Sequence, residues 1–497
     1  MSTGDRERTS ATVLERFRPL FEPRGVVIAG ASSHPGKFGF VAAHNLLAAG
    51  YRGEVFLTNR EGGEILGRSA LRSIDEVPAG AADLVFVCTP PATVPELLRT
   101  CAAKGIRAAF MATAGYGELG EEGKRAERDL AALCAELGIV LAGPNGQGVV
   151  STPVDLCAQI VAPMPPRGHI AVASQSGGFV QAFLNYARKT GVGVSRAVSA
   201  GNCAATAVED YLEYFADDPE TRVSLIYVEG LADGRAFFEK TRRAAAKKPL
   251  VVFKGGTTTG GQRAAASHTG ALASDDRVFD GMCRQAGLTR AHSIEEAFEL
   301  AASFATHPLP RGPNVFVLTT AGGWGVVTAD RISASRDLRL MPIPADLRAA
   351  FDEKLPPRWS RSNPADLAGS ETRDTVVECL DLVASHPEVD AIVFLGLGIQ
   401  SNLGDMERHG PFYPDHGLER VVEFHARQDT RYSEMALELE RRHQKPILIA
   451  TELVDCQPEN PGPATLRRAG SLAYPSSHRA VGALEHLWRR ARRTTAA

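Results

Sequence analysis

The apolar residues of this chain gather in short runs that stop at small or polar residues. The clearest runs are Val26–Ser32, Ile170–Gly178 and Val315–Gly323, each of which begins apolar and ends in Gly, Ala, Ser or Thr. An apolar run of four to eight residues bounded by turn signals is typical of a strand buried on both faces. The pattern therefore predicts three strands, each followed by a small-residue loop and then a helix.

These three segments recur at roughly the length of one domain. Between them strand and helix patterns alternate, as where Asp83–Cys88 precedes Val94–Lys104, which predicts parallel sheets with helical crossovers. Proline-rich stretches at Pro153–Pro166 and His307–Pro313 mark breaks. The sequence predicts an α/β chain of three consecutive doubly wound domains, at 1–152, 153–308 and 309–497.

Composition narrows the class of protein. A net charge of -3 gives no electrostatic case for binding nucleic acid or an anionic membrane. The eight cysteines show no C-x-x-C spacing, so we expect neither disulfides nor a metal site, and a reducing compartment. Ser2–Ser10 is polar where a secretory signal would turn apolar, and no apolar run reaches the roughly 20 residues of a membrane span. We expect a soluble, cytoplasmic protein.

His268 is the candidate for covalent chemistry. It lies in the small-residue stretch Ala264–Ala273, downstream of Gly255 and Gly256, and we interpret this segment as a mobile loop. Near neutral pH much of an imidazole is unprotonated and nucleophilic, so it can carry a phosphoryl group. A structural or surface role is the alternative for any single histidine. Glu229 supports the catalytic reading, because it ends a buried strand where ligands collect and could stabilise an imidazolium.

Six motifs in this order resemble the NDP-forming acyl-CoA synthetases, as in the α subunit of ADP-forming acetyl-CoA synthetase and, more distantly, succinyl-CoA synthetase. The resemblance covers nearly the whole chain. It implies an N-terminal Rossmann-like CoA-binding domain followed by two flavodoxin-like domains of the succinyl-CoA synthetase type. The motifs are Gly30–Ser32 with Pro35–Lys37, Gly143–Asn145, Ser174–Gly178, Gly255–Gly256, Ser267–Ala273 and Asn363–Leu367.

The resemblance implies an acid–thiol ligase that interconverts acyl-CoA, phosphate and ADP with a carboxylic acid, CoA and ATP. The implied intermediates are an acyl phosphate and a phosphohistidine at His268, with Glu229 beside the imidazole and Asn145 near the thioester. Relatives often carry cysteine after that asparagine, whereas this chain has Gly146, which puts the acyl preference in doubt. Neither the acid nor the choice of ADP over GDP follows from the sequence.

The resemblance also implies where the ligands bind. A helix N-terminus offers unpaired N–H groups and a positive dipole end to phosphate groups, which is the physical basis for both assignments. Serine in such a turn can instead be an ordinary cap, and a lysine there can simply be exposed. The expected CoA residues are Gly30, Ser32, Lys37, Thr89, Pro90 and Pro91, and the expected phosphate residues are Ser174, Ser176, Gly177 and Gly178.

One component of such an enzyme has no counterpart in the sequence. The chain has neither a Walker A pattern nor spare length for an ATP-grasp unit. We therefore expect a separate ATP-grasp β-type subunit that holds the nucleotide and Mg²⁺, in a hetero-oligomer, or a homodimer when the chain is alone. Residues 401–433 do not match the family and are polar, so we expect an irregular surface insertion there.

Two other functions stay open at this point. The chain could be a catalytically silent protein that binds CoA or acyl-CoA and regulates another process, although Glu229 and His268 would then have no purpose. It could also be a nicotinamide-dependent oxidoreductase. The residues after Gly30 lack the full G-x-G-x-x-G pattern, which disfavours a dinucleotide.

Overall fold

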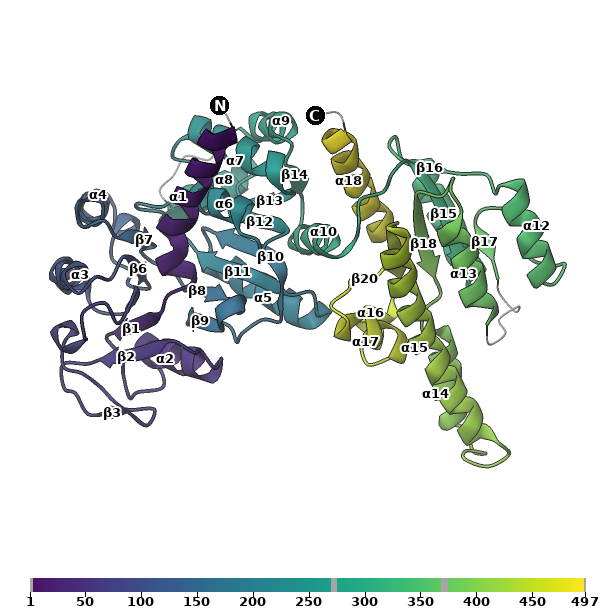
Figure 1. Ribbon diagram of the computed structural model, residues 1–497, viewed down its shortest axis with the longest axis horizontal. Coiled ribbons are helices and arrows are strands. Elements are labelled where there is room, and N and C mark those ends of the chain that lie inside the picture. The colour runs from purple at the N-terminus through teal and green to yellow at the C-terminus, as the bar shows by residue number, and fades with distance from the viewer. Residues whose placement is uncertain (1–2, 270–274, 368–373, 496–497) are drawn as a thin grey trace. The chain divides into compact units, whose positions relative to one another are not determined.

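The computed structural model describes residues 3–269, 275–367 and 374–495, without the side chains of 3–11 and 265–269 (Figure 1). The chain divides into two compact units, Met1–Lys189 with Gly193–Ala301, and Thr190–Val192 with Ala302–Ala497. The first unit contains two large sheets and the second unit contains one. In the first two sheets the five parallel strands follow one order, in which the second strand precedes the first and the third to fifth follow. The third sheet has the same order apart from one additional short strand. The predicted class, three consecutive doubly wound α/β domains, is confirmed.

The first sheet is parallel and is covered by helices on both faces. Successive side chains of a strand point to opposite faces, so β1 contributes to two cores. Ile28 belongs to the core that contains Leu46 of α2, and Val27 to the core that contains Leu98 of α3. The elements are α1 Thr3–Phe21, β1 Gly25–Ala29, α2 Phe38–Ala48, β2 Glu54–Thr58, β3 Glu64–Ile65, β4 Arg68–Ser69, η1 Ile74–Glu76, β5 Leu84–Val87, η2 Pro91–Thr93, α3 Val94–Ala103, β6 Ala108–Met111, η3 Gly117–Leu119, α4 Glu121–Leu137 and β7 Val140–Ala142.

The second sheet adds an antiparallel hairpin, β8–β9, to the edge of its five parallel strands. The expected boundary between residues 152 and 153 falls inside this hairpin, and the division into domains stays a prediction. The elements are β8 Gly148–Ser151, η4 Thr152–Val154, β9 Leu156–Gln159, β10 Arg167–Ser174, α5 Gly177–Thr190, β11 Val194–Ser199, α6 Val208–Asp217, β12 Val223–Val228, α7 Gly234–Lys247, β13 Leu250–Lys254, α8 Thr259–Thr269, α9 Asp276–Ala286, β14 Thr289–Ala291 and α10 Ile294–Thr306.

A buried arginine joins the N-terminal segment to the second sheet. Arg196 on β11 is fully buried, and its Nε lies 3.1 Å from Oδ2 of Asp218, which is also buried. Its Nη2 lies 2.5 Å from Oε1 of Glu22, the residue after α1. A buried charge is tolerated only when it is paired, so this cluster holds α1 against the second sheet.

The third sheet forms the core of the second unit, where β17 pairs with β15 on the same side as β16. None of the helices within the described residues combines the length and the apolar composition that a membrane crossing requires. The elements are β15 Asn314–Thr319, α11 Gly322–Ser333, β16 Arg339–Leu340, α12 Ala345–Lys354, β17 Ala365–Asp366, α13 Thr375–Ser385, β18 Ala391–Leu395, α14 Ile399–Arg408, α15 Leu418–His443, β19 Ile447–Ala450, α16 Leu453–Cys456, α17 Pro461–Arg468, β20 Ala473–Tyr474 and α18 Ser477–Thr495.

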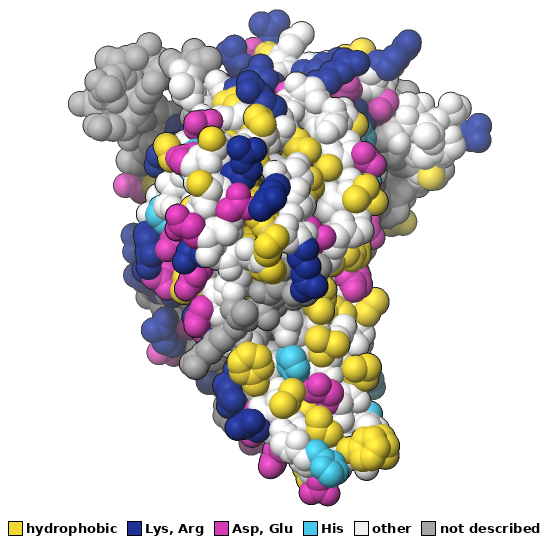
Figure 2. Space-filling view, turned by 90° about the vertical axis from the view of Figure 1, so that its right-hand side faces the viewer, with side chains coloured by type: hydrophobic (Ala, Val, Ile, Leu, Met, Phe, Trp, Pro, Cys, Tyr) yellow, Lys and Arg dark blue, Asp and Glu magenta, His cyan; other side chains and the backbone are white. Residues whose placement is uncertain are grey.

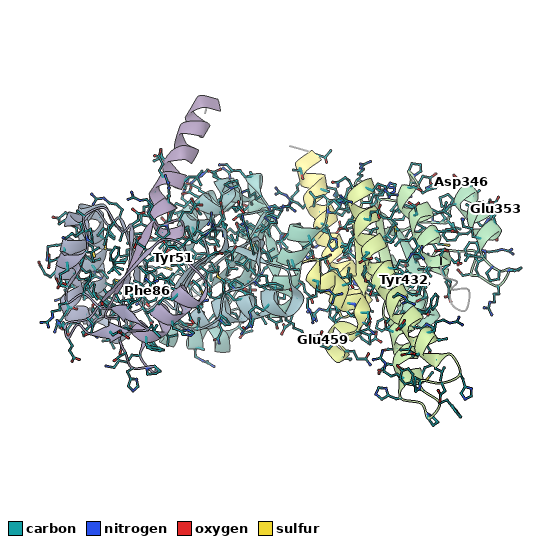
Figure 3. All side chains as sticks on the ribbon, turned by 60° about the horizontal axis from the view of Figure 1, so that its bottom comes forward. Tyr51, Phe86, Asp346, Glu353, Tyr432 and Glu459 are labelled. Carbon is teal, nitrogen blue, oxygen red and sulfur yellow. The ribbon has the colours of Figure 1, made fainter. Side chains whose placement is uncertain are left out.

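The expected irregular insertion at 401–433 is wrong, because α14 and α15 account for most of it and lie side by side (Figure 1). Tyr432, labelled in Figure 3, projects from α15 into the core of the third sheet. The apolar period of α15 is hidden because polar residues occupy inward positions, among them Asp429 and Ser433, which are fully buried. The Asp429 carboxylate accepts hydrogen bonds from the backbone N–H groups of Gly398 and Ser401, and so caps α14.

The far end of these two helices is exposed. Figure 2 shows hydrophobic side chains among polar ones in the lower part of the view, where α14 and α15 join. Met406 and Phe412 are the most exposed large hydrophobic residues of this segment, at 66% and 64% of their full surface. Exposed residues of this kind, spread over one turn and one loop, are common on protein surfaces and do not by themselves mark a site.

We expect Arg196→Ala to lower the free energy of unfolding by about 3–5 kcal/mol, because it leaves the buried Asp218 carboxylate without its partner. Arg235→Ala is the matched control, since Arg235 pairs with Glu239 on an exposed helix face and such pairs contribute about 1 kcal/mol or less. Urea unfolding followed by circular dichroism measures both. Equal effects of the two substitutions would contradict this account of the cluster.

Candidate active site

The residues expected to bind ligands lie at the carboxyl ends of strands in the first unit. Gly30, Ser32 and Lys37 follow β1, and Thr89, Pro90 and Pro91 follow β5. In the second sheet, the Ser174–Gly178 loop follows β10 and Glu229 follows β12. Ligands of doubly wound sheets bind at this edge, next to the strand where the order reverses. In both sheets the reversal falls at these strands, β1 with β5 and β10 with β12.

The loop after β1 brings the backbone of α2 close to the strand. Gly30 has φ +85°, and a Cβ on Gly39 would lie 2.0 Å from the Gly30 carbonyl oxygen, so both positions require glycine. The Ser32 hydroxyl is buried and accepts a hydrogen bond of 3.0 Å from the His34 N–H, which orders the loop. Lys37 is exposed at the N-terminus of α2, whose first turn has no acidic residue. This helix end is suited to an anion.

A cleft of about 500 Å³ opens beside this loop. It contains Thr89, Pro90 and Asn145 of the expected residues, and Phe38, the neighbour of Lys37. Gly30, Ser32, Lys37 and Pro91 do not line it. Its lining residues are Phe38, Cys88, Thr89, Pro90, Ala112, Thr113, Ala114, Asn145, Gly146, Gln147 and Ile160.

Asn145 is held in the cleft by its backbone. Its φ is +59°, in the left-handed region that asparagine tolerates better than most residues, and its N–H donates to the Thr113 carbonyl at 3.0 Å. The Thr113 hydroxyl in turn donates to the Thr89 carbonyl at 2.8 Å. The turn that carries Asn145 is thereby tied to the turn that carries Thr89.

Burial controls the chemistry of the one thiol in the cleft. Cys88 follows β5, and burial raises the pKa of its thiol to about 12. At neutral pH the group is therefore almost entirely protonated and a poor nucleophile. The cleft offers a neutral, largely apolar lining, without a reactive thiolate from Cys88.

Gly146 stands where the family resemblance led us to expect cysteine, and its surroundings leave no room for a side chain. A Cβ at this position would lie 2.6 Å from Cζ of Phe110 and 2.9 Å from the Ser199 carbonyl oxygen. Phe110 is fully buried and stacks on Phe86, so its ring has little room to move. The space of a side chain at 146 is taken by an aromatic ring from β6.

The Ser174–Gly178 loop forms the N-terminus of α5. Ser174 is fully buried, and its hydroxyl accepts from the Ser176 N–H and donates to the Ser176 carbonyl, so it shapes the loop. Gly178 is exposed in the first turn. A Cβ on Gly177 would lie 2.1 Å from Cδ of Gln147, which places the Gln147 side chain against this loop. Because Gln147 also lines the cleft, the cleft and the N-terminus of α5 are adjacent.

Glu229 is buried beside the loop that leads to α8. The side chain of Gln175 holds the turn, since its Oε1 accepts from the N–H groups of Glu229 and Gly230. Burial, and then the charge and hydrogen bond of Glu229, raise the pKa of the Tyr227 hydroxyl. A Cβ on Gly255 would lie 2.4 Å from that hydroxyl and 3.6 Å from Cγ of Glu229. The carboxylate therefore lies next to the start of the segment that carries His268.

The interpretation of that segment as a mobile loop is wrong over Thr259–Thr269, because the backbone of His268 lies in the last turn of α8. Thr258 starts the helix, as its hydroxyl accepts from Gly261 N–H and its carbonyl from Gln262 N–H. Three consecutive alanines then favour a helix more strongly than the glycines oppose it. The side chain of His268 and residues 270–273 lie outside the described residues.

Three side chains of the site were missed by the sequence analysis or given no role. Gln147 joins the cleft to α5, Gln175 fixes the Glu229 turn, and Asn202 contacts Asn145. Each acts across loops that are distant in sequence, so no local motif announces it. The sequence feature that came closest to indicating one of them was Gly146, because it lies between Asn145 and Gln147. No cluster of three His, Cys, Asp or Glu side chains suited to a metal occurs in the described part of the chain.

Comparison with known proteins gives a consistent picture. Family models match a CoA binding domain at residues 24–152, a succinyl-CoA ligase like flavodoxin domain at 167–304 and a Ligase-CoA domain at 315–399. The chain is 36% identical to the α subunit of ADP-forming acetate–CoA ligase I of Pyrococcus furiosus over 380 residues, which are 76% of this chain and 82% of the relative.

Two further similarities extend the comparison. The chain is 30% identical to the ADP-forming 4-hydroxybutyrate–CoA ligase of Nitrosopumilus maritimus, over 76% of this chain and 54% of that longer protein. The solved structure of acetyl-coenzyme A synthetase 1 of Ca. Korarchaeum cryptofilum, in complex with phosphate and ADP, superposes with a TM-score of 0.81 at 28% identity. That superposition covers 96% of this chain and 97% of the other.

We expect Gly146→Ala to lower the free energy of unfolding by about 1–3 kcal/mol, because the added Cβ overpacks against Phe110 and a backbone oxygen. Gly234→Ala is the control, since a Cβ there meets nothing within 4 Å and its φ is ordinary. Adding Phe110→Leu to Gly146→Ala makes room and should recover part of the loss. Urea unfolding midpoints give the comparison, and a Gly146→Ala protein as stable as Gly234→Ala would show that the site is not packed as described.

Proposed function

The chain belongs to the family of ADP-forming acyl-CoA synthetases and is a relative of their α subunits. We propose that its first unit binds both reactants of the acyl transfer, the acyl-CoA thioester and phosphate. The reaction takes an acyl-CoA thioester, phosphate and ADP to a carboxylic acid, CoA and ATP, and it is reversible. The observation that carries the proposal is the adjacency of the cleft around Asn145 to the N-terminus of α5, through Gln147 and Gly177.

The CoA moiety binds along the first sheet. Its phosphates lie at the N-terminus of α2, where Lys37 and unpaired N–H groups stabilise negative charge. Ser32 and Gly30 keep the loop close to the strand so that the backbone can approach the ligand. The pantetheine arm passes Thr89 and Pro90, which line the cleft, and brings the thioester to Asn145.

Phosphate binds at the N-terminus of α5, at the N–H groups of Gly177 and Gly178, in the loop that also contains Ser174 and Ser176. A phosphate oxygen attacks the thioester carbon, the carbon–oxygen bond forms and the carbon–sulfur bond breaks. CoA leaves as a thiolate that takes up a proton, and the acyl phosphate remains. Asn145 lines the cleft, and in this proposal its side chain donates to the carbonyl oxygen as the negative charge on that oxygen grows.

His268 then attacks the phosphorus of the acyl phosphate, and the carboxylic acid leaves as its anion. The buried carboxylate of Glu229 stabilises the imidazolium that forms in this step. The segment that carries His268 starts beside Glu229, at Gly255, which supports this pairing. The phosphoryl group passes from His268 to ADP in the last step.

The last step requires a nucleotide site, which we assign to a partner subunit of the ATP-grasp type. The relative from Pyrococcus furiosus is named as one subunit of its enzyme, which supports a partner for this chain. The partner would hold ADP with Mg²⁺, and the working enzyme would be a hetero-oligomer. Longer relatives, of which this chain spans about half, leave room for such a unit in the same polypeptide.

The lining of the cleft also defines a class of acyl group. No charged side chain occurs among the described residues that line it. A second carboxylate on the acyl group would lose its hydration there without gaining a partner, and that costs several kcal/mol. The substrate is therefore an uncharged acyl group, from a monocarboxylic acid.

The phosphohistidine is tested by mixing the purified chain with radiolabelled phosphate and acetyl-CoA. We expect acid-labile, alkali-stable label on the protein, lost in His268→Ala because the acceptor nitrogen is gone. His292→Ala is the matched control, as His292 is exposed in the same domain and should keep full labelling. Absence of label in the parent protein, with an ATP-grasp partner present and CoA binding confirmed by calorimetry, leaves a CoA-binding protein instead of a ligase.

The acyl class is tested by comparing succinyl-CoA with its methyl ester, which has nearly the same shape without the charge. We expect kcat/KM for phosphate-dependent CoA release to be at least about 100-fold higher for the ester, because only the free acid buries a carboxylate. A thiol reagent follows the released CoA. Equal kcat/KM values for the two thioesters would mean that a cation pairs with the second carboxylate, and would contradict the claim that the uncharged lining excludes such acyl groups.

A further inference from the structure

We propose that Asn202 is a positioning residue for the reaction, which sets the orientation of the Asn145 side-chain amide toward the thioester. The proposal rests on the proposed function for its catalytic meaning. Asn202 lies in the loop between β11 and α6, in the second sheet, whereas Asn145 lies in the turn after β7, in the first. The Nδ2 atom of Asn145 lies 3.4 Å from Oδ1 of Asn202.

Two carboxylates fix the amide of Asn202. Its Nδ2 donates to Oε2 of Glu118 at 2.7 Å and to Oε2 of Glu127 at 2.8 Å, which uses both amide hydrogens. A carboxylate can only accept, so the flipped orientation would bring the Asn202 oxygen against two acceptors. The oxygen of Asn202 must therefore point away from the glutamates, toward Asn145.

The glutamates are themselves anchored to the loop after β6. Backbone N–H groups of Gly115 and Gly117 donate to Glu118 and Glu127 respectively, the latter at 3.1 Å. Burial would raise the pKa of Glu118, but hydrogen bonds from the Gly115 N–H and the Asn202 amide hold it below its usual value. The Glu118 carboxylate is thus ionised at neutral pH and remains an acceptor.

The consequence for Asn145 follows from the same donor and acceptor rule. With the Asn202 oxygen facing it, Asn145 must present Nδ2 toward Asn202, because the flipped amide would bring two oxygens together. One hydrogen of Nδ2 is then engaged, and the side chain is locked in one of its two orientations. The second hydrogen can donate to an acyl carbonyl oxygen in the cleft.

The side chain of Asn202 is not needed to hold the two loops together. The Asn202 backbone N–H donates to the Pro144 carbonyl at 3.0 Å, and the Ala204 N–H donates to the Gly143 carbonyl at 3.2 Å. A Cβ on Gly201 would lie 2.1 Å from that Pro144 oxygen, so the backbones are in direct contact. Since the backbone makes the junction, the side-chain relay is free to serve orientation.

The test compares Asn202→Ala with the parent protein in two half-reactions. We expect kcat for phosphate-dependent CoA release from acetyl-CoA to fall about 10–100-fold, with KM changed less than about twofold, because orientation acts in the transition state. Labelling of His268 by added acetyl phosphate should fall less than about threefold, since the thioester is bypassed. Asn185→Ala, an exposed amide on α5, is the control and should change neither.

A rescue experiment separates positioning from a merely structural role. Asn202→Asp alone should lower kcat as much as Asn202→Ala does, because it places a third carboxylate against Glu118 and Glu127. Adding Glu118→Gln and Glu127→Gln supplies donors to position 202, so that one oxygen there again faces Asn145. The new amide at position 127 must turn, because Oε2 of Glu127 also accepts from the Gly117 N–H. We expect kcat to return to within about fivefold of the parent. Full activity of Asn202→Ala, or equal loss in both half-reactions without rescue, overturns the proposal.

A spectroscopic readout distinguishes failure of this proposal from failure of the proposed function. If the parent protein releases no CoA, the proposed function fails, and the side-chain amide signal of Asn145 in a ¹⁵N spectrum still reports its orientation. We expect that signal, assigned by its loss in Asn145→Asp, to shift in Asn202→Ala and to stay in place in Asn185→Ala. An unchanged signal in Asn202→Ala overturns the relay whatever the activity.

Discussion

The contact between two backbone loops, one from each sheet of the first unit, is the constraint on which the site depends. Gly201 and Pro144 approach so closely that a Cβ on the glycine would overlap the carbonyl oxygen. Gly143 is equally restricted, since its φ is +99° and a Cβ there would lie 2.6 Å from the Met111 carbonyl oxygen. Contacts as close as these require that one of the two residues has no Cβ. They fix the Asn145 end of the cleft against the second sheet.

The architecture was predictable because its strands are buried on both faces. Parallel strands covered by helices have continuous apolar sequences, and the runs at Val26, Ile170 and Val315 each form the first parallel strand of a sheet. The positions of the candidate site residues were predictable for the same reason, because the carboxyl ends of such strands share an edge of the sheet. Ser174 shows that a correctly predicted position does not establish a role. It lies at the predicted edge, but its hydroxyl is hydrogen-bonded to the backbone of Ser176 in its own loop.

The features that sequence reasoning missed depend on tertiary contacts. Inward polar residues of α15, such as Asp429, interrupt its apolar period because they bond to another helix. We predicted a loop at α8 because its glycines and other small residues are typical of a linker. The hydrogen bond from the Gly261 N–H to the Thr258 hydroxyl, which starts the helix, is visible only in the structure. Asn202 and Gln147 act on loops far away in sequence, and only folding reveals their partners.

We infer that the first unit holds a preorganised acyl-transfer site, in which the cleft and the N-terminus of α5 meet through Gln147. Binding sites that are fixed in advance lower the barrier because little reorganisation is left for the reaction itself. The most direct measurement is a crystal structure of the chain with CoA and phosphate. The account predicts the CoA sulfur beside Asn145 and a phosphate ion at Gly177 and Gly178, close enough for a bond to form. A CoA thiol directed away from Asn145, or phosphate bound elsewhere, would contradict it.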